Sequence, residues 1–509
     1  MPILNSIFSW LNTKRLHQIE LFRQFPFEVQ QEMLFKLISR AKGTEYGIKY
    51  DFESIKEIKD FQQRLPILDY EGIKPFIDKH REGQQDILWP GNIKWFAKSS
   101  GTTANKSKFI PVSSEALEDC HFRGGQDILA IYTNLHPESE IFKGKSLTLG
   151  GSHKIDNFNI DSYYGDLSAI LIENIPWWAD FIRTPSQKVA LISEWEEKLE
   201  QLTQETIKEN VTSIAGVPSW NLVMIKHILN FTGKKNLLEV WPNLELFMHG
   251  GVCFTPYREQ FQKLIPSPTM NYMEAYNASE GFFAIQDNPQ TDDMLLMLDY
   301  GIFYEFIPLE EAFSTNPTAL TLNEVELNQN YALVISTNSG LWRYMIGDTI
   351  KFTSKYPHKI KITGRTRHFI NAFGEEVIID NADNALNTAC EKTGALVREY
   401  TAAPIYMDEN AKGAHEWLIE FERVPSDLDF FTQVLDNALC SINSDYEAKR
   451  YKGITLGPPI IRRLNNGTFF MWMKERGKLG GQNKVPRLFN TREYVDELIE
   501  LSKRCCNEK

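Results

Sequence analysis

The stretch Ser99-Ser-Gly-Thr-Thr103, with Lys106 and Lys108 just behind it, is the most informative part of this sequence. It follows the mostly apolar run 93–97, which is typical of a short strand. Its glycine allows a positive φ and a close backbone approach, and successive N–H groups can form a concavity that binds anions. The segment therefore predicts a phosphate-binding turn for a nucleoside triphosphate. Its candidate ligands are Ser99, Ser100, Gly101, Thr102, Thr103 and Lys108.

This turn differs from the common P-loop, which has the pattern Gly-x-x-x-x-Gly-Lys-Ser/Thr. The chain does contain Gly144-Lys-Ser146, but Ser139 stands where the first glycine should be. The sequence also lacks His-Glu-x-x-His, Cys-x-x-Cys and EF-hand patterns. These observations argue against a P-loop kinase or GTPase. The metal that we expect is Mg²⁺ carried in with the nucleotide, without a dedicated protein site.

Length and composition limit the class of protein. At 509 residues the chain is longer than one hydrophobic core supports, so we expect two or more domains. A net charge of −12 disfavours nucleic acid and anionic membranes as main partners. We find no signal peptide and no run of about 18 apolar residues, which favours a cytoplasmic protein without a transmembrane segment. The six cysteines are then expected to be free thiols.

The order of strand-like and helix-like segments predicts a large α/β domain. A helical start over residues 14–42 should break at Pro26, because proline lacks an N–H and clashes with the preceding turn. From Leu295 to Phe352 the pattern is mostly β, which indicates a β-rich subdomain with turns at Asn316-Pro317 and Asn338–Gly340. Between these two parts, strands are expected at 146–149, 211–215, 244–248 and 269–273, and a helix at 187–206.

After Gly364 the pattern changes to α+β, which predicts a second, smaller domain. A closing helix should begin at Asn490, because Glu493 follows as in a capping box. We therefore divide the chain into an N-terminal domain, 1–363, and a C-terminal domain, 364–509. Within the second domain, helices are expected at 380–393 and 427–443, and strands at 415–423 and 468–474.

Four further segments carry groups that a nucleotide site needs. His249-Gly-Gly251 follows a strand-like run, so a flat base could lie on the backbone of Gly250 and Gly251. Another predicted strand precedes Tyr276, which offers an aromatic face, and Glu280, whose carboxylate could hold Mg²⁺. Each of these residues is ordinary by itself: turn glycines are common, a tyrosine is more often core, and a glutamate is more often a surface charge.

The other two segments lie near the expected domain boundary. Tyr344-Met-Ile-Gly-Asp348 should end a strand with a carboxylate that accepts both ribose hydroxyls. Gly364-Arg365 opens a segment that runs on to Phe373-Gly-Glu-Glu-Val377. Considered alone, Asp348 would be an ordinary turn residue, and Arg365 would be an ordinary solvent-exposed charge. The combination of all five segments, in this order, carries the argument.

Together these segments resemble the adenylate-forming ANL superfamily, and the fit extends over essentially the whole chain. In finer detail the chain resembles the auxin-responsive Gretchen-Hagen family of acyl acid amido synthetases. The shared features are the turn leading to Phe109-Ile-Pro111, the form Ala278-Ser-Glu280, and Gly481-Gln-Asn-Lys-Val-Pro-Arg487. Thr103-Ala104 and Gly281-Phe282 depart from the plant-type forms, which suggests a bacterial-type member.

The resemblance implies a fold and a two-stage reaction. A large N-terminal α/β adenylate-forming domain would be followed by a smaller, mobile α+β C-terminal domain. A carboxylic acid would attack ATP to give acyl-AMP and pyrophosphate, and the amine of an amino acid would then take the acyl group. The implied catalytic residues are Lys484, which would bridge the carboxylate and the α-phosphate, and Glu280, which would hold Mg²⁺. The implied nucleotide ligands are Ser99, Ser100, Gly101, Thr102, Thr103, Lys108, Gly250, Gly251, Tyr276, Ser279, Tyr344, Asp348 and Arg365.

Two other functions stay open at this point. An acyl-CoA ligase shares the first stage and differs only in its nucleophile. A non-catalytic nucleotide-binding protein is the second alternative, although it would be expected to have lost some of the charged site residues. His121, Phe122 and Arg123 are candidates for a wall of the acyl pocket, with Arg123 as a possible carboxylate holder. The sequence leaves the acid, the acceptor and the oligomeric state open, a monomer included.

Overall fold

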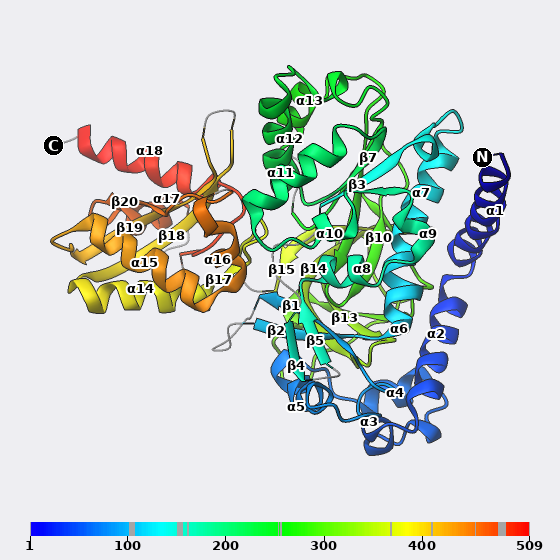
Figure 1. Cartoon of the computed structure of the whole chain (residues 1–509). Helices are drawn as coiled ribbons and strands as arrows, with labels where there is room; N and C mark the ends of the chain where they lie inside the picture. The colour runs from blue at the N-terminus through cyan, green and yellow to red at the C-terminus, as the bar shows by residue number, and fades with distance from the viewer. Residues whose placement is uncertain are drawn as a thin grey trace.

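The computed structural model describes residues 2–100, 107–149, 156–159, 162–252, 254, 257–366, 369–408, 411–453, 455–476 and 485–507. It has a large N-terminal part and a smaller C-terminal part (Figure 1). In Figure 1, α1 and α2 line one edge of the large part, and the smaller part lies at the opposite side. The expected fold class is thus confirmed, whereas the boundary at 363/364 stays a prediction.

Two helices open the chain, α1 (Pro2–Gln24) and α2 (Pro26–Ala41). The break at Pro26 is confirmed, and proline occupies the first turn of α2, where its missing N–H costs nothing. The first helix begins earlier than residue 14. Shorter helices follow: α3 (Glu45–Lys49), α4 (Ile58–Arg64) and α5 (Tyr70–Arg81).

A small four-stranded sheet of order β2-β1-β5-β4 carries the phosphate-binding segment. Strands β1 (Trp95–Ser100) and β2 (Ser107–Val112) form an antiparallel hairpin in which Ser99 lies opposite Lys108. Ser99 and Ser100 therefore belong to a strand, and the prediction that they lie in the turn was wrong. Their backbones pair with Lys108 and Ser107 of β2 in the hairpin ladder. The other strands are β4 (Asp156–Asn159) and β5 (Ser162–Gly165).

An eleven-stranded sheet of order β12-β13-β14-β15-β11-β10-β9-β8-β7-β3-β6 forms the centre of the large part. It is parallel from β6 to β9 and antiparallel from β9 to β12, as the expected α/β and β-rich regions require. Its strands are β3 (Lys145–Thr148), β6 (Arg183–Thr184), β7 (Val211–Gly216), β8 (Leu246–His249), β9 (Asn271–Ala278), β10 (Gly281–Ile285), β11 (Met294–Leu296), β12 (Ile302–Pro308), β13 (Asn330–Thr337), β14 (Tyr344–Lys355) and β15 (His358–Arg365).

Three predictions about these strands were wrong in their bounds. Tyr276 lies inside β9, so the tyrosine segment continues a strand that was expected to end at residue 273. Tyr344 opens β14, so Asp348 lies within that strand instead of at its end. Asn316-Pro317 lies in the long connection between β12 and β13 and makes no tight hairpin, whereas Asn338–Gly340 does turn the chain from β13 to β14.

Helices cover the sheet. The segment expected to be one helix at 187–206 is two, α10 and α11, and Glu196 and Glu197 mark the start of the second because acidic side chains favour a helix N-terminus. A π-helical turn, Leu117–Phe122, precedes α7. The helices are α6 (Ser114–Ala116), α7 (Arg123–Leu135), α8 (Leu167–Glu173), α9 (Trp177–Asp180), α10 (Gln187–Ala190), α11 (Trp195–Thr206), α12 (Pro218–Thr232) and α13 (Arg258–Leu264).

The C-terminal part begins with a two-stranded hairpin and then forms a three-stranded sheet of order β18-β19-β20. One hydrophobic cluster joins this part to the large one, since it includes Ile225 of α12 as well as Trp417 of β19. The strands are β16 (Phe369–Ile370), β17 (Val377–Ile378), β18 (Leu396–Ile405), β19 (Ala414–Arg423) and β20 (Ile460–Leu464). The helices are α14 (Ile379–Thr393), α15 (Leu428–Ile442), α16 (Ser444–Arg450), α17 (Thr468–Glu475) and α18 (Glu493–Asn507).

Residues 468–474 form helix α17, so the strand predicted there was wrong. Phe469, Trp472 and Met473 are buried, whereas Phe470 and Met471 are exposed. Burial at positions i, i+3 and i+4 is the helical period. The aromatic residues of this segment favour a strand by composition, and packing against α18 decides otherwise.

The closing helix α18 begins at Glu493, so the predicted start at Asn490 was also wrong. The Asn490 side chain instead bonds outside the helix, where its Oδ1 accepts a hydrogen bond from the Asn371 backbone N–H at 2.6 Å. Thr401 likewise donates to the Pro486 carbonyl at 2.8 Å. These contacts join residues 485–490 to the segment that carries the β16–β17 hairpin and to β18. In the described part of the chain no helix is long and apolar enough to cross a membrane.

Candidate active site

The β1–β2 hairpin presents Lys108 toward the predicted nucleotide site. Lys108 is 7% exposed, and burial lowers the pKa of its ammonium group, while the nearby Glu280 carboxylate opposes this shift. Tyr70 supports the hairpin, because its hydroxyl accepts a hydrogen bond from the Phe109 N–H at 2.9 Å. The predicted ligands Gly101, Thr102 and Thr103, and Lys106 beside them, lie outside the described residues.

The turn after β8 packs directly on β9. A Cβ atom on Gly250 would lie 2.4 Å from the Ala275 carbonyl oxygen, so only glycine fits there. Gly251 has a φ of +82°, which also favours glycine. His249 is buried, and burial lowers the pKa of its imidazole to about 3, so the ring is neutral. Neither Gly250 nor Gly251 adds a side chain of its own to this turn, and the Cβ side of Gly250 is packed against β9.

A hydrogen-bonded network joins three of the predicted site residues. The Tyr276 hydroxyl donates to Asp348 Oδ2 at 2.7 Å, and Arg365 Nε lies 2.9 Å from Asp348 Oδ1. Asp348 and Arg365 face each other in the β14–β15 ladder, and this register brings them together. Arg365 Nη2 also lies 2.8 Å from Glu376 Oε1. We call these four residues, Tyr276, Asp348, Arg365 and Glu376, the site network.

Glu280 lies in the turn between β9 and β10, next to Ser279. Burial raises the pKa of Glu280, and the Lys108 ammonium counteracts this rise. Asp348 and Arg365 also act on Glu280, so the turn lies beside the site network. The Tyr344 hydroxyl is buried nearby and has no hydrogen-bond partner in the described part of the chain. Lys108, Glu280, Tyr344 and the site network thus come together from the β1–β2 hairpin, from β9, β14 and β15, and from the connection between β16 and β17.

Glu376 was not singled out from the sequence. It follows Gly374 and Glu375 in the β16–β17 hairpin and adopts a φ of +41°, which is unusual for a residue with a side chain. The Asn443 amide donates to the carbonyls of Glu375 and Glu376 at 3.0 and 3.1 Å. Glu375 is fully buried, and its carboxylate pairs with His415 at 2.8 Å. A positive φ cannot be predicted from the sequence. The only sequence feature that could have drawn attention to Glu376 is its place as the second glutamate after the turn residue Gly374.

The candidate acyl-pocket residues lie at the π-helical turn and the start of α7. His121 is buried, and burial lowers the pKa of its ring to about 4. Arg123 pairs with Asp119 at 2.7 Å, and its Nη1 lies 3.5 Å from the Asp299 carbonyl. Its guanidinium therefore already has partners within the protein. Whether Phe122 and Arg123 contact an acyl acid stays a prediction.

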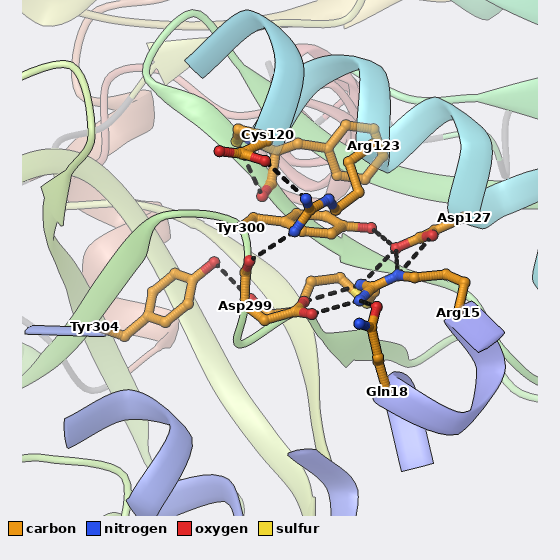
Figure 2. Close-up of polar contacts among 11 residues, drawn as sticks. Arg15, Gln18, Cys120, Arg123, Asp127, Asp299, Tyr300 and Tyr304 are labelled. Atoms are coloured by element: carbon orange, nitrogen blue, oxygen red, sulfur yellow. Dashed lines mark hydrogen bonds and ion pairs between the residues drawn. The ribbon is translucent and has the colours of Figure 1, made fainter. Parts of the chain in front are cut away.

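A second polar network lies beside Arg123 (Figure 2). Arg15 of α1 bonds the Asp127 carboxylate of α7 at 2.7 Å and also pairs with Asp299. The Tyr300 hydroxyl donates to Asp127 at 2.6 Å. We call these residues, Arg15, Asp127, Asp299 and Tyr300, the helix clamp. No sequence pattern pointed to it, because the chain separates Arg15 from Asp299 by 284 positions.

Two expectations receive no structural answer. Lys484 lies outside the described residues, although its downstream neighbours from Val485 onward are described. Among the described residues, no group of three or more His, Cys, Asp or Glu side chains is placed to hold a metal ion. A role for Glu280 toward Mg²⁺ therefore stays a prediction.

Comparison with known proteins supplies the family. Models of the GH3 family N-terminal, central and C-terminal domains match residues 15–270, 295–365 and 380–493. Indole-3-acetic acid-amido synthetase GH3.4 of Arabidopsis thaliana is 25% identical over 93% of this chain and 91% of its own. The 4-substituted benzoates-glutamate ligase GH3.12 of the same plant is 22% identical, covering 92% of this chain and 94% of its own.

Solved structures agree on the fold. GH3.15 acyl acid amido synthetase superposes with a TM-score of 0.60, at 17% identity, over 96% of this chain and 95% of its own. A 2-hydroxyisobutyryl-CoA ligase superposes with a TM-score of 0.56, at 13% identity, over 93% of this chain and 91% of its own.

The fold is thus of the class found in an acyl acid amido synthetase and in a CoA ligase. Within that class, the chain belongs to the GH3 family of acyl acid amido synthetases, because the family models match most of its length. The expected family is confirmed. Membership of a bacterial-type branch stays a prediction.

Proposed function

We propose that this enzyme uses ATP to activate a carboxylic acid as acyl-AMP and then transfers the acyl group to the amine of an amino acid. One observation carries the proposal: Lys108, Glu280 and the site network converge from separate elements on one place. Two cations beside three carboxylates suit a reaction between a carboxylate and a polyphosphate, since the barrier is charge repulsion.

In the first half-reaction, the nucleotide would be held along the β1–β2 hairpin and the turn after β8. Lys108 would neutralise phosphate charge, and Asp348 would accept hydrogen bonds from the ribose hydroxyls. Tyr276, which already donates to Asp348, fixes the orientation of that carboxylate. The adenine would lie on the bare backbone of Gly250 and Gly251. These residues orient the α-phosphorus for attack by the acid, and such positioning supplies much of the catalysis.

The Glu280 carboxylate fits an Mg²⁺ ion brought in with ATP. Apart from the backbone of Glu280 itself, none of the described residues hydrogen-bonds or ion-pairs with its side chain, and a hard oxygen ligand of this kind suits Mg²⁺. When bound, the ion would neutralise charge on the phosphates. The raised pKa of Glu280 indicates that the buried carboxylate favours a positive partner.

The second half-reaction distinguishes this proposal from an acyl-CoA ligase. The curated relatives are named for amide-forming reactions, with indole-3-acetic acid in one case and with 4-substituted benzoates and glutamate in the other. Their acids differ, so the acid used here is a question for experiment. We infer an amino acid as the acceptor because it is the acceptor named for a relative that aligns over 92% of this chain.

A panel of carboxylic acids tests the proposal, with pyrophosphate release as the first readout. Each active acid is then offered amino acids, coenzyme A or hydroxylamine, and the products are identified by mass spectrometry. An amide with an amino acid is the expected product. Release of pyrophosphate followed only by a thioester would replace the proposal with an acyl-CoA ligase, and no release with any acid would remove the adenylation step.

Lys484 tests how the two half-reactions are divided. If it bridges the carboxylate and the α-phosphate, Lys484→Ala should abolish adenylation and spare amide formation from chemically prepared acyl-AMP. Circular dichroism controls for the fold. Equal loss in both halves would indicate a general defect, and intact adenylation would remove Lys484 from the mechanism.

A further inference from the structure

An amino acid acceptor brings a chemical requirement that the residues discussed so far do not meet. Near neutral pH its nitrogen is an ammonium group, which has no lone pair for attack on acyl-AMP. A carboxylate beside the reacting centre could bind this cation and receive its proton. Glu280 and Asp348 are already assigned to Mg²⁺ and to ribose. A third carboxylate, Glu376, lies in the same cluster.

Glu376 is placed to reach a substrate in this cluster. Its Oε1 lies 2.8 Å from Arg365 Nη2, and its side chain is 21% exposed. It also lies close enough to Lys108 to act on the charge of that ammonium group. The residue follows the predicted domain boundary, so it belongs to the C-terminal part, which the second half-reaction is expected to bring into use.

The backbone at Glu376 is held in a conformation that few residues adopt. Its φ of +41° is the left-handed region, which costs free energy for any residue with a side chain. Surrounding groups enforce it: the Asn443 amide binds the carbonyls of Glu375 and Glu376, and the Glu375 carboxylate accepts the N–H groups of Ala372 and Phe373 at 3.1 and 2.6 Å. Glycine would meet the backbone requirement more easily, so the carboxylate has a use of its own.

We propose that Glu376 is the catalytic residue that binds the ammonium group of the amino acid and receives its proton during acyl transfer. The inference rests on the proposed function. The amine lone pair forms the new C–N bond to the acyl carbon, and the C–O bond to AMP breaks with its electron pair going to the phosphate oxygen. The ammonium group first gives one proton to the Glu376 carboxylate, which frees the lone pair for attack, and Glu376 passes that proton to solvent. The nitrogen loses its second proton by the same route as the amide forms, so two protons are released for each amide. Asn443 acts as a positioning residue for this carboxylate.

The test compares two acceptors that differ in charge. Glu376→Gln is assayed with purified acyl-AMP, using either the amino acid or hydroxylamine, which is largely neutral at pH 8 and needs no prior deprotonation. We expect transfer to the amino acid to fall by about 100-fold, the usual contribution of general base catalysis, while transfer to hydroxylamine changes little. In the variant, the remaining amino acid reaction should rise with pH as free amine forms.

A second substitution separates chemistry from folding. Glu376→Gly suits a φ of +41°, so it should fold at least as well as the native chain and still lose transfer to the amino acid. The exposed Glu391→Gln on α14 is a matched control that should change neither acceptor reaction. Pyrophosphate release from acid and ATP should persist in Glu391→Gln, and it is measured in both Glu376 variants so that any loss of adenylation is counted separately from loss of transfer.

Three results would overturn the assignment: an active Glu376→Gly, equal losses with both acceptors in Glu376→Gln, or no loss with the amino acid. Failure of the proposed function gives a different result. The native enzyme would then release no pyrophosphate or form no amide from acyl-AMP, and this is measured before any variant is compared.

Discussion

Arg15 and Arg365 lie among similar groups and do different things. Each guanidinium lies between two carboxylates, and in each case a tyrosine hydroxyl donates to one of them. In the helix clamp every one of these groups is bonded within the protein, and Asp127 is 1% exposed (Figure 2). It fastens α1 to α7 and to the turn before β12.

The site network is surrounded by groups that lack such partners. Neither Lys108 nor Glu280 hydrogen-bonds through its side chain to another described residue, and the Tyr344 hydroxyl is buried without a partner among them. Buried polar groups are nearly always satisfied in folded proteins. The comparison therefore teaches that the ion pairs themselves do not identify a site. What sets this network apart from the helix clamp is that two buried charged groups, Lys108 and Glu280, lie beside it without a side-chain partner among the described residues.

The largest expected effect separates the two arginines by stability. Arg15→Met leaves the Asp127 carboxylate buried without its cation, so the free energy of unfolding should fall by about 3–5 kcal/mol. Arg365→Met should cost clearly less, because Asp348 and Glu376 are 13% and 21% exposed and water can reach them. Chemical denaturation of both variants measures the difference. If both variants lost the same free energy of unfolding, the site network would stabilise the fold as much as the helix clamp does.

Glu280→Gln should affect catalysis and leave the fold unchanged. If the carboxylate holds Mg²⁺, pyrophosphate release should fall by about 100-fold, and nucleotide binding much less. The raised pKa of Glu280 adds a pH test, because the native carboxylate should gain its proton at a higher pH than an ordinary glutamate does. Activity should therefore fall as the pH is lowered through that raised pKa, and the variant should lack this acid limb. If Glu280→Gln released pyrophosphate at the native rate with saturating Mg²⁺ and ATP, Glu280 would have no role in adenylation.

Asp348→Asn should weaken ATP binding by about tenfold or more, since charge-assisted hydrogen bonds contribute roughly 1.5–3 kcal/mol. Asp299→Asn is the matched control, because Asp299 has the corresponding place in the helix clamp. Calorimetry with ATP should show a changed Kd for the first variant and the native Kd for the second. An unchanged Kd in Asp348→Asn would contradict the ribose assignment.

The smallest effect compares two hydroxyl groups. Tyr300→Phe removes the hydrogen bond to Asp127 and should cost about 1 kcal/mol of stability without changing the ATP Kd. Tyr276→Phe removes the hydrogen bond to Asp348 and should raise the ATP Kd by about fivefold. Thermal unfolding and calorimetry of both variants are sufficient. If Tyr300→Phe and Tyr276→Phe changed stability and the ATP Kd to the same extent, the helix clamp and the site network would not differ in function.

Several residues that the sequence singled out lie together in the fold, but the sequence did not show how they contact one another. Asp348 was recognised from its pattern, but its partner Arg365 is opposite only because of the β14–β15 register, which sequence spacing does not show. Tyr276 was placed after a strand that was expected to end at residue 273, whereas pairing with β10 extends β9 to Ala278. The φ of Glu376 depends on Asn443, 67 positions away.

Elements with strong local signals were predicted closely. Helix α15 begins at Leu428 because Asp427 caps it, accepting from the Phe430 N–H, and the prediction missed this start by one residue. Helix α14 ends at Thr393, and Gly394 follows with a φ of +69°. Helix α17 was misread because its aromatic residues favour a strand, and only packing against its neighbours selects the helix.

The bond between Asn490 and Asn371 has a consequence for the order of events. It ties the chain from Val485 onward to the segment that leads into Glu376. If the C-terminal part rotates between the two half-reactions, these two segments would move together. One movement would then change the surroundings of both segments at once, and the two half-reactions would need no separate signal to follow one another.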